Sequence, residues 1–197
     1  AAFGLPLLQL IDLNKQHIQA IILVPTRELG HQIFSSMEAY ATYLPEISMA
    51  ATCGGIPIKP KIERLTKTTH IVIATQGRLI DLVKRKEIDI KQTDFLDLDE
   101  ADEKVTTLKE GLDEIIAELP KKKRTFLFTA TLSGTVKQLV QNYMSKNVIQ
   151  VSVDMKTVGN LGIDHKYVVV EPIEKLKVLM NFLSSKDGER VIIFCKT

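Results

Sequence analysis

The residues of this chain that could do chemistry form three short polar motifs, each of which directly follows a run of apolar residues. The motifs are residues 25–30 (Pro-Thr-Arg-Glu-Leu-Gly), 99–102 (Asp-Glu-Ala-Asp) and 129–131 (Thr-Ala-Thr). A short apolar run is typical of a buried parallel strand, and open α/β sheets bind their ligands at the carboxyl ends of such strands. Paired carboxylates at that position suit a hydrated Mg²⁺ ion and the phosphates of a nucleotide.

Two carboxylates of the acidic motif have different expected roles. Asp99 could hold Mg²⁺ through water, because this ion keeps much of its hydration shell. Glu100 could orient or deprotonate the water that attacks a γ-phosphate. Outside this context an Asp-Glu-x-Asp segment is usually a solvated acidic turn. Here its place after an apolar strand, in order with the other motifs, favours a functional site.

The sequence lacks the second half of such a site. No Gly-x-x-x-x-Gly-Lys-Ser/Thr phosphate loop occurs among the 197 residues, although this is the loop whose backbone and lysine cradle nucleotide phosphates. The chain also starts without an initiator methionine and stops just after an apolar run at residues 191–195. We therefore expect it to be a segment of a longer protein that holds half of a nucleoside triphosphate site.

The elements that must position these motifs alternate between strand-like runs and helical periodicity, which predicts a parallel sheet covered by helices on both faces. The predicted strands are residues 20–24, 48–53, 70–74, 95–98, 126–128 and 148–153. The predicted helices are residues 26–44, 58–66, 79–85, 108–118 and 135–144. Residues 154–163, with two glycines and little apolar content, predict a linker. Beyond it we predict a strand, a helix and a strand at residues 165–170, 173–185 and 191–195.

Composition is that of an ordinary soluble globular protein, with 45% hydrophobic and 25% charged residues. A net charge of +2 permits nucleic-acid binding without arguing for it. Cys53 and Cys195 lack metal-type spacing and predict reduced, buried thiols in a cytosolic protein. No apolar run approaches the ~18 residues of a membrane span. The basic run at residues 121–124 follows Pro120. We interpret it as a solvated connection rather than as a nucleic-acid patch.

Taken in order, the motifs make the chain resemble a DEAD-box ATP-dependent RNA helicase over essentially all of its length. The matching segments are residues 25–29 for motif Ia, Gly54 and Gly55 for the glycine doublet, 75–78 (Thr-Gln-Gly-Arg) for motif Ib, 99–102 for motif II, 129–131 for motif III and 191–197 for the strand of motif IV. In that family, residues 1–8 would directly follow the lysine and threonine of the phosphate loop.

The resemblance implies a RecA-like α/β fold with a parallel sheet and helices on both faces. Residues 1–153 would form the N-terminal RecA-like domain without its phosphate loop, residues 154–163 the linker, and residues 164–197 the beginning of the C-terminal RecA-like domain. The implied function is unwinding or remodelling of RNA coupled to ATP hydrolysis, with ATP and Mg²⁺ as cofactors, in the cytoplasm, or in the nucleus of a eukaryote. The segment alone would be inactive, no membrane is involved, and no protein partner is indicated.

The resemblance also assigns roles to individual residues. Glu100 and Asp99 would be catalytic, with Asp99 holding Mg²⁺ through water, and Asp102, Thr129 and Thr131 would couple this site to RNA. RNA would be bound through its backbone and without sequence preference, at positions in turns and at helix starts: Pro25, Thr26, Arg27, Gly54, Gly55, Thr75, Gly77 and Arg78. Read as structure alone, the threonines are helix caps and the glycine doublet is a plain turn.

Four features depart from the family pattern. Asp97 stands where an aliphatic residue is usual, Gln76 replaces a turn proline, Thr129 replaces serine, and residues 103–108 are more polar. An unpaired carboxylate in a strand covered on both faces would cost several kcal/mol or be protonated. The alternative hypothesis, from another class, is a non-catalytic RNA-binding or protein-interaction module derived from such a helicase. The missing phosphate loop favours this alternative for the segment itself.

Overall fold

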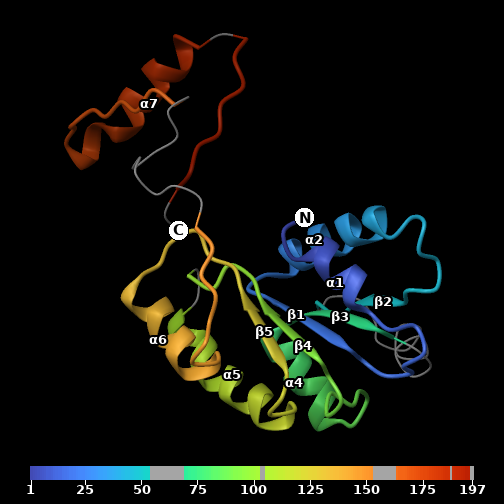
Figure 1. The fold of residues 1–197 in the computed structure, drawn as a ribbon. Helices are drawn as coiled ribbons and strands as arrows, with labels where there is room; N and C mark the ends of the chain where they lie inside the picture. Colours follow the sequence, from blue (N-terminus) through green and yellow to red (C-terminus); the bar gives the residue numbers. More distant parts are fainter. Residues whose placement is uncertain (54–68, 103–104, 153–162, 187, 196–197) are drawn as a thin grey trace. The chain divides into compact units, whose positions relative to one another are not determined.

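The computed structural model describes residues 1–53, 69–102, 105–152, 163–186 and 188–195, without the side chains of residues 105–110. The chain divides into two compact units, Ala1–Val148 and Ile149–Thr197. Within the described residues, the first unit carries the sheet and every motif segment except residues 191–195, which belong to the second unit (Figure 1).

The first unit contains a parallel sheet of five strands in the order β2-β3-β1-β4-β5. The strands are β1 (Ala20–Val24), β2 (Met49–Ala51), β3 (Ile71–Thr75), β4 (Phe95–Leu98) and β5 (Arg124–Leu127). Every residue of the central strand β1 is buried, as expected for a parallel strand that has helices on both faces. The apolar run at residues 20–24 therefore predicted this strand with the bounds that are observed.

Helices cover both faces of the sheet (Figure 1). They are α1 (Gly4–Leu10), α2 (Arg27–Tyr40), α4 (Gln76–Lys84), α5 (Val105–Glu118) and α6 (Gly134–Tyr143). Alternate residues of β1 face opposite cores. Ile22 packs with residues of α1 and α2 such as Leu7 and Met37, whereas Ile21 packs with residues of α4, α5 and α6 such as Leu82 and Leu139.

Some predicted boundaries in the first unit need correction. The strand predicted at residues 48–53 is limited to Met49–Ala51, because only these residues pair with β3. The helix predicted at residues 26–44 ends at Tyr40, where a turn precedes Pro45. The helix predicted at residues 58–66 lies outside the described residues.

The second unit shows that an apolar run alone does not make a strand. Its described part contains a short 3-10 turn, Pro172–Glu174, and the helix α7, Lys175–Ser184, which confirms the predicted helix. The strands predicted at 148–153, 165–170 and 191–195 do not form within the described residues. Val169 and Phe194 are 86% and 93% exposed. A strand requires a neighbouring backbone with which to exchange hydrogen bonds, and these runs have no such neighbour in the described part of the unit.

No helix within the described residues is both long enough and apolar enough to cross a membrane.

Asp97 occupies the buried position that the sequence indicated. It lies in β4 opposite Ile22 of β1 and Phe126 of β5, and its residue surface is 0% exposed. Neither carboxylate oxygen has a hydrogen-bond partner among the described residues. Burial, together with the nearby Asp99, raises the pKa of Asp97 well above its ordinary value. Burial without a counter-charge therefore favours the protonated form of this carboxyl group.

Candidate functional site

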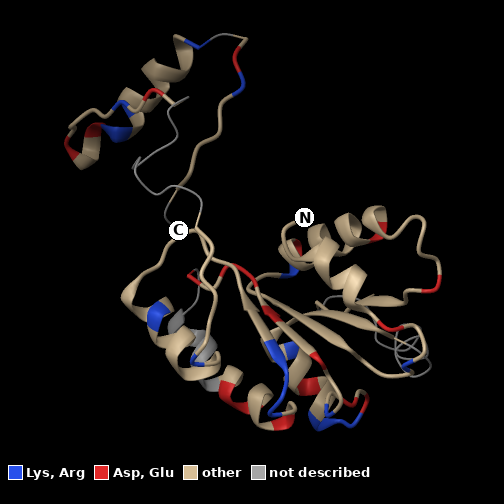
Figure 2. Ribbon diagram, in the orientation of Figure 1, with Lys and Arg blue, Asp and Glu red and all other residues tan. Residues whose placement is uncertain are grey.

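The predicted site residues lie at one end of the sheet, because parallel strands all finish at the same end. We call this the carboxyl end. The motif segments follow their strands there in spatial order: 75–78 after β3, 25–27 after β1, 99–102 after β4 and 129–131 after β5. Figure 2 shows acidic residues in red where the chain leaves β4. Gly54 and Gly55 lie outside the described residues.

The acidic loop after β4 is held by hydrogen bonds that continue the sheet beyond its strands. The Asp99 N–H donates to the carbonyl of Leu23 at 3.1 Å, and the Ala101 N–H donates to the carbonyl of Phe128 at 3.1 Å. The loop is thus fixed to the ends of both neighbouring strands, β1 and β5. Such support gives a site the positional accuracy that chemistry at phosphate requires.

Asp99 and Glu100 differ in environment. Asp99 is half-buried, which raises the pKa of its carboxyl, while the Glu100 N–H, donating to Asp99 Oδ1 at 3.0 Å, opposes this shift. Glu100 is exposed and has a φ of 49°. A left-handed backbone is uncommon for a residue other than glycine, and such conformations cluster at functional sites. The two carboxylates therefore have distinct positions, as two distinct roles would require.

The donor set at this end of the sheet suits Mg²⁺ bound together with phosphate. Mg²⁺ is usually held by one or two carboxylates plus phosphate oxygens and water, and Asp99 and Glu100 offer oxygen donors only. Within the described residues no group of three His, Cys, Asp or Glu side chains could hold a metal by itself. The arrangement fits an ion that arrives with a nucleotide.

Asp102 ties the loop after β4 to the loop after β5. Its Oδ2 accepts hydrogen bonds from the hydroxyl of Thr131 at 2.7 Å and from the Thr131 N–H at 2.9 Å. The Thr131 hydroxyl is the main cause of a lowered pKa at Asp102. The Thr129 hydroxyl donates to the carbonyl of Thr131 at 2.8 Å. The three residues predicted to couple the site are therefore brought together by the fold.

This network excludes the simpler interpretation of the two threonines as helix caps. The N-cap of α6 is Ser133, whose Oγ accepts from the Val136 N–H at 3.3 Å. The hydroxyls of Thr129 and Thr131 are used between loops instead. For Thr26 the simpler interpretation is confirmed, because its Oγ1 accepts from the Leu29 N–H at 3.2 Å and caps α2.

The segments after β1 and β3 lie next to each other, because Val24 and Thr75 are partners in the register of these strands. Arg27 is exposed as the first residue of α2. Thr75 is the N-cap of α4, but its side chain makes no capping hydrogen bond within the described residues. Gly77 is exposed, and a Cβ added to it would meet no described atom within 4 Å. This side of the carboxyl end is open to another molecule.

Arg78 is less free than the sequence suggested. Its Nη1 lies 2.7 Å from Oδ2 of Asp81, and its side chain is only 20% exposed. Asp81 also accepts from Nε of Arg85 at 2.7 Å. Asp81 is the residue that sequence reasoning missed, although the spacing of three and four residues from its two arginines on one helix was the available signal.

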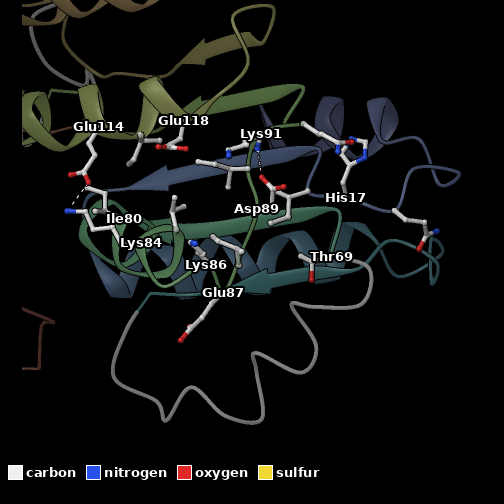
Figure 3. A pocket seen from close by; sticks show the side chains of 17 residues that line it. His17, Thr69, Ile80, Lys84, Lys86, Glu87, Asp89, Lys91, Glu114 and Glu118 are labelled. Carbon is white, nitrogen blue, oxygen red and sulfur yellow. Dashed lines mark hydrogen bonds and ion pairs between the residues drawn. The ribbon is translucent and has the colours of Figure 1, made fainter.

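A cavity lies away from the motif residues. Its volume is about 870 Å³, and residues that come just before β1, β3 and β4 line it, so it lies at the opposite end of the sheet (Figure 3). Charges of both signs surround it, including an ion pair of Lys84 and Glu114 at 2.8 Å. None of the predicted site residues lines this cavity. The candidate chemistry belongs to the exposed carboxyl end.

The five-stranded parallel sheet, with its acidic loop after β4, defines a RecA-like α/β domain. The crystal structure of a DEAD box protein from the hyperthermophile Methanococcus jannaschii has the same fold, with a TM-score of 0.70 and 31% sequence identity. The similarity covers 94% of this chain and 49% of that chain. The DEAD/DEAH box helicase family model matches residues 1–139. The chain belongs to this family.

Curated relatives extend the similarity to the whole chain. The ATP-dependent RNA helicase DeaD of Mycobacterium tuberculosis is 32% identical over 198 residues, covering 100% of this chain and 35% of the relative. The ATP-dependent RNA helicase CshA of Listeria monocytogenes is 33% identical over 199 residues, covering 100% of this chain and 38% of the relative. The chain thus spans a little over a third of the length of these relatives.

Proposed function

We propose that the protein is an ATP-dependent RNA helicase that couples ATP hydrolysis to the unwinding or remodelling of RNA in the cytoplasm. In this proposal residues 1–153 belong to the first RecA-like domain, residues 154–163 form the linker, and residues 164–197 begin the second RecA-like domain. Family membership and the order of motifs along the carboxyl end support it. The chain by itself, which has no phosphate loop, would not hydrolyse ATP.

The observation that carries the proposal is the pair of hydrogen bonds from Thr131 to Asp102. They join the loop of Asp99 and Glu100 to the next loop along the carboxyl end. Mg²⁺ and ATP, when bound, would supply the reacting γ-phosphoryl group and neutralise its developing charge. Asp99 would hold the ion through water, and Glu100 would position the attacking water and take its proton.

A contact between two aromatic rings supports the placement of a phosphate loop next to the loop of Asp99 and Glu100. The ring of Phe3 lies 5.4 Å from the ring of Phe128, centroid to centroid. The start of the chain is thus beside the end of β5, one residue before Thr129. Burial raises the pKa of Asp99, and the positive charge of the Ala1 amino group opposes this shift. In a longer form of the protein, the residues before Ala1 would therefore be close to Asp99. A lysine and backbone N–H groups there would complete the nucleotide site.

RNA would bind on the β1 and β3 side of the carboxyl end. Three features suit contact with a sugar-phosphate backbone. Arg27 is exposed, the Thr75 hydroxyl makes no capping hydrogen bond within the described residues, and an added Cβ on Gly77 would meet no described atom within 4 Å. Such contacts carry no sequence information, so recognition would be independent of sequence. The complete proposed RNA surface consists of Pro25, Thr26, Arg27, Gly54, Gly55, Thr75, Gly77 and Arg78.

The second candidate function is a non-catalytic RNA-binding or interaction module. Two observations favour it: the 197 residues contain no phosphate loop, and Asp97 places an unpartnered carboxyl in the strand that leads to the acidic loop. The two candidates differ in one property, which is ATP turnover by a longer form of the protein.

RNA-stimulated ATP hydrolysis decides between the candidates. The assay uses a longer form that includes a phosphate loop and a whole second domain. We expect RNA-dependent turnover that Glu100→Gln lowers by ~10²-fold or more, because a positioned base is lost. Glu46→Gln, at an exposed glutamate away from the site, serves as the matched control and should be silent. Full activity in Glu100→Gln would remove Glu100 from this role, and no turnover in the wild type would favour the non-catalytic module.

A further inference from the structure

Gln76, which stands where the family has a turn proline, packs against a glycine on another helix. Gln76 is the first residue of α4, and Gly111 lies within α5. A Cβ added to Gly111 would lie 1.9 Å from Nε2 of Gln76 and 2.8 Å from its Cδ. The amide of Gln76 therefore occupies space that exists only because residue 111 has no side chain.

This contact joins two parts of the carboxyl end that the sheet keeps apart. Gln76 belongs to the segment after β3, on the proposed RNA side. Helix α5 begins at Val105, three residues after Asp102, on the proposed nucleotide side. Strand β1 separates β3 from β4 in the sheet. The Gln76–Gly111 contact thus bridges β1 through the helical layer.

We propose that Gln76 is a positioning residue, and that its packing on Gly111 holds the 75–78 turn in the conformation that binds the RNA backbone. A proline at this position would restrict the turn by its own ring, which fixes φ. Glutamine has no such constraint, so the turn is fixed by the contact with α5 instead. The same contact transmits a displacement of the loop at residues 99–102 to Thr75 and Arg78. This inference rests on the proposed role of the turn in RNA binding.

Gly111→Ala in the 197-residue chain tests the contact directly. The added methyl group overlaps the flexible end of the Gln76 side chain and lies 3.0 Å from Cδ1 of Ile80. We expect the Gln76 amide to move away and Ile80 to shift only slightly, so that the helices stay packed. Alanine also favours the helix over glycine. We expect the dissociation constant for a short single-stranded RNA, measured by fluorescence anisotropy, to rise about fivefold, the coupling usual for side chains in contact. The backbone amide resonances of Thr75 and Arg78 should shift, and the melting temperature should not fall.

Gly134→Ala is the matched control, because a Cβ on Gly134 would meet no described atom within 4 Å. It should leave RNA affinity and the two resonances unchanged. Gln76→Ala should lose the same affinity as Gly111→Ala, and it keeps the proposal testable if Gly111→Ala does not fold. Adding Gln76→Pro to Gly111→Ala should restore affinity, since the proline ring replaces the contact. A role in helix packing alone would not give this rescue.

The outcomes separate this inference from the proposed function. If Arg78→Ala weakens RNA binding but Gln76→Ala and Gly111→Ala do not, the positioning role of Gln76 is wrong and the RNA side stands. If none of the three weakens binding, the RNA role of the turn is wrong, and the inference falls with it. Failure of Gln76→Pro to rescue Gly111→Ala would also overturn the inference.

Discussion

Asp97 is an ionisable residue at a completely buried position of the sheet. In β4 its carboxyl group is completely buried, and within the described residues it has no hydrogen-bond partner. The sequence predicted this situation, because alternation along β4 places Asp97 on a covered face. The same reasoning did not find Asp81, whose importance lies in the side-chain geometry of Arg78 and Arg85.

We expect Asp97→Val to raise the free energy of unfolding by ~1–3 kcal/mol, the usual cost of an unsatisfied buried polar group. The folded-state pKa of Asp97 is raised above its ordinary value of 3.8. Ionisation of Asp97 therefore costs no stability below pH 3.8, and the free energy of unfolding falls as the pH rises from 3.8 to the folded-state pKa, because the unfolded chain gives up this proton first. The gain in the variant should grow with pH over that range.

Urea unfolding at several pH values measures this gain. Asp89→Val, at an exposed aspartate, should show no comparable rise. A lower stability of Asp97→Val than of the wild type at neutral pH would mean that Asp97 has a stabilising partner and a role of its own.

Gly77 allows stability and binding to be separated at one residue. It is exposed near the start of α4, and an added Cβ would meet no described atom within 4 Å. Gly77→Ala should therefore keep or raise stability, by up to ~1 kcal/mol from helix propensity. It should weaken RNA binding, because the methyl group fills the space that the RNA backbone would approach. Unfolding and RNA titrations on the same samples test both parts, and unchanged RNA affinity would exclude the close approach.

At the scale of elements, the sequence predicted best where burial determines structure. β1 is buried along its whole length and was predicted with the observed bounds. The apolar run at residues 191–195 was predicted wrongly as a strand, because periodicity describes a strand's own residues and not its hydrogen-bonding neighbour. The cap interpretation of Thr131 failed for a similar reason. A hydroxyl immediately before a helix can cap it, but Thr131 lies two residues before the N-cap Ser133. Its hydroxyl donates instead to the carboxylate of Asp102 on another loop.

The link between the loops after β4 and β5 makes a specific prediction. Thr131→Val removes the hydroxyl that is the main cause of the lowered pKa of Asp102, while the backbone N–H bond can remain. The pKa of Asp102, followed by carboxyl carbon NMR, should rise toward its ordinary value of 3.8. Stability from Asp102 is present above that value and is lost as the pH falls through the folded-state pKa, so the variant should lose less stability on acidification.

Thr42→Val is a suitable comparison, because the exposed Thr42 hydroxyl donates to the carbonyl of Ala39, three residues earlier. It should leave Asp102 unchanged. An unaltered pKa of Asp102 in Thr131→Val would contradict the coupling geometry.

At the scale of the whole molecule, the parallel sheet places two kinds of chemistry side by side. The segments after β3 and β1 offer an exposed arginine, a hydroxyl and an open glycine, whereas the segments after β4 and β5 offer carboxylates joined to threonines. The two groups of segments occupy different halves of the carboxyl end because β3 and β1 are neighbours, as are β4 and β5. The sequence predicted the strands that these segments follow, but the spatial order β2-β3-β1-β4-β5 depends on long-range pairing that local patterns do not encode.

The most direct test of this arrangement is ATP hydrolysis by a longer, phosphate-loop-containing form while single-stranded RNA is titrated. Arg78→Ala should raise the RNA concentration for half-maximal stimulation equally for every RNA sequence, and should leave the rate at saturating RNA unchanged. Arg85→Ala, which removes the other arginine bonded to Asp81, should change neither the RNA concentration for half-maximal stimulation nor the rate at saturating RNA. Glu100→Gln should abolish hydrolysis at every RNA concentration without weakening RNA binding. The account would be contradicted if Arg78→Ala lowered only the saturated rate, or if Glu100→Gln retained hydrolysis while losing RNA.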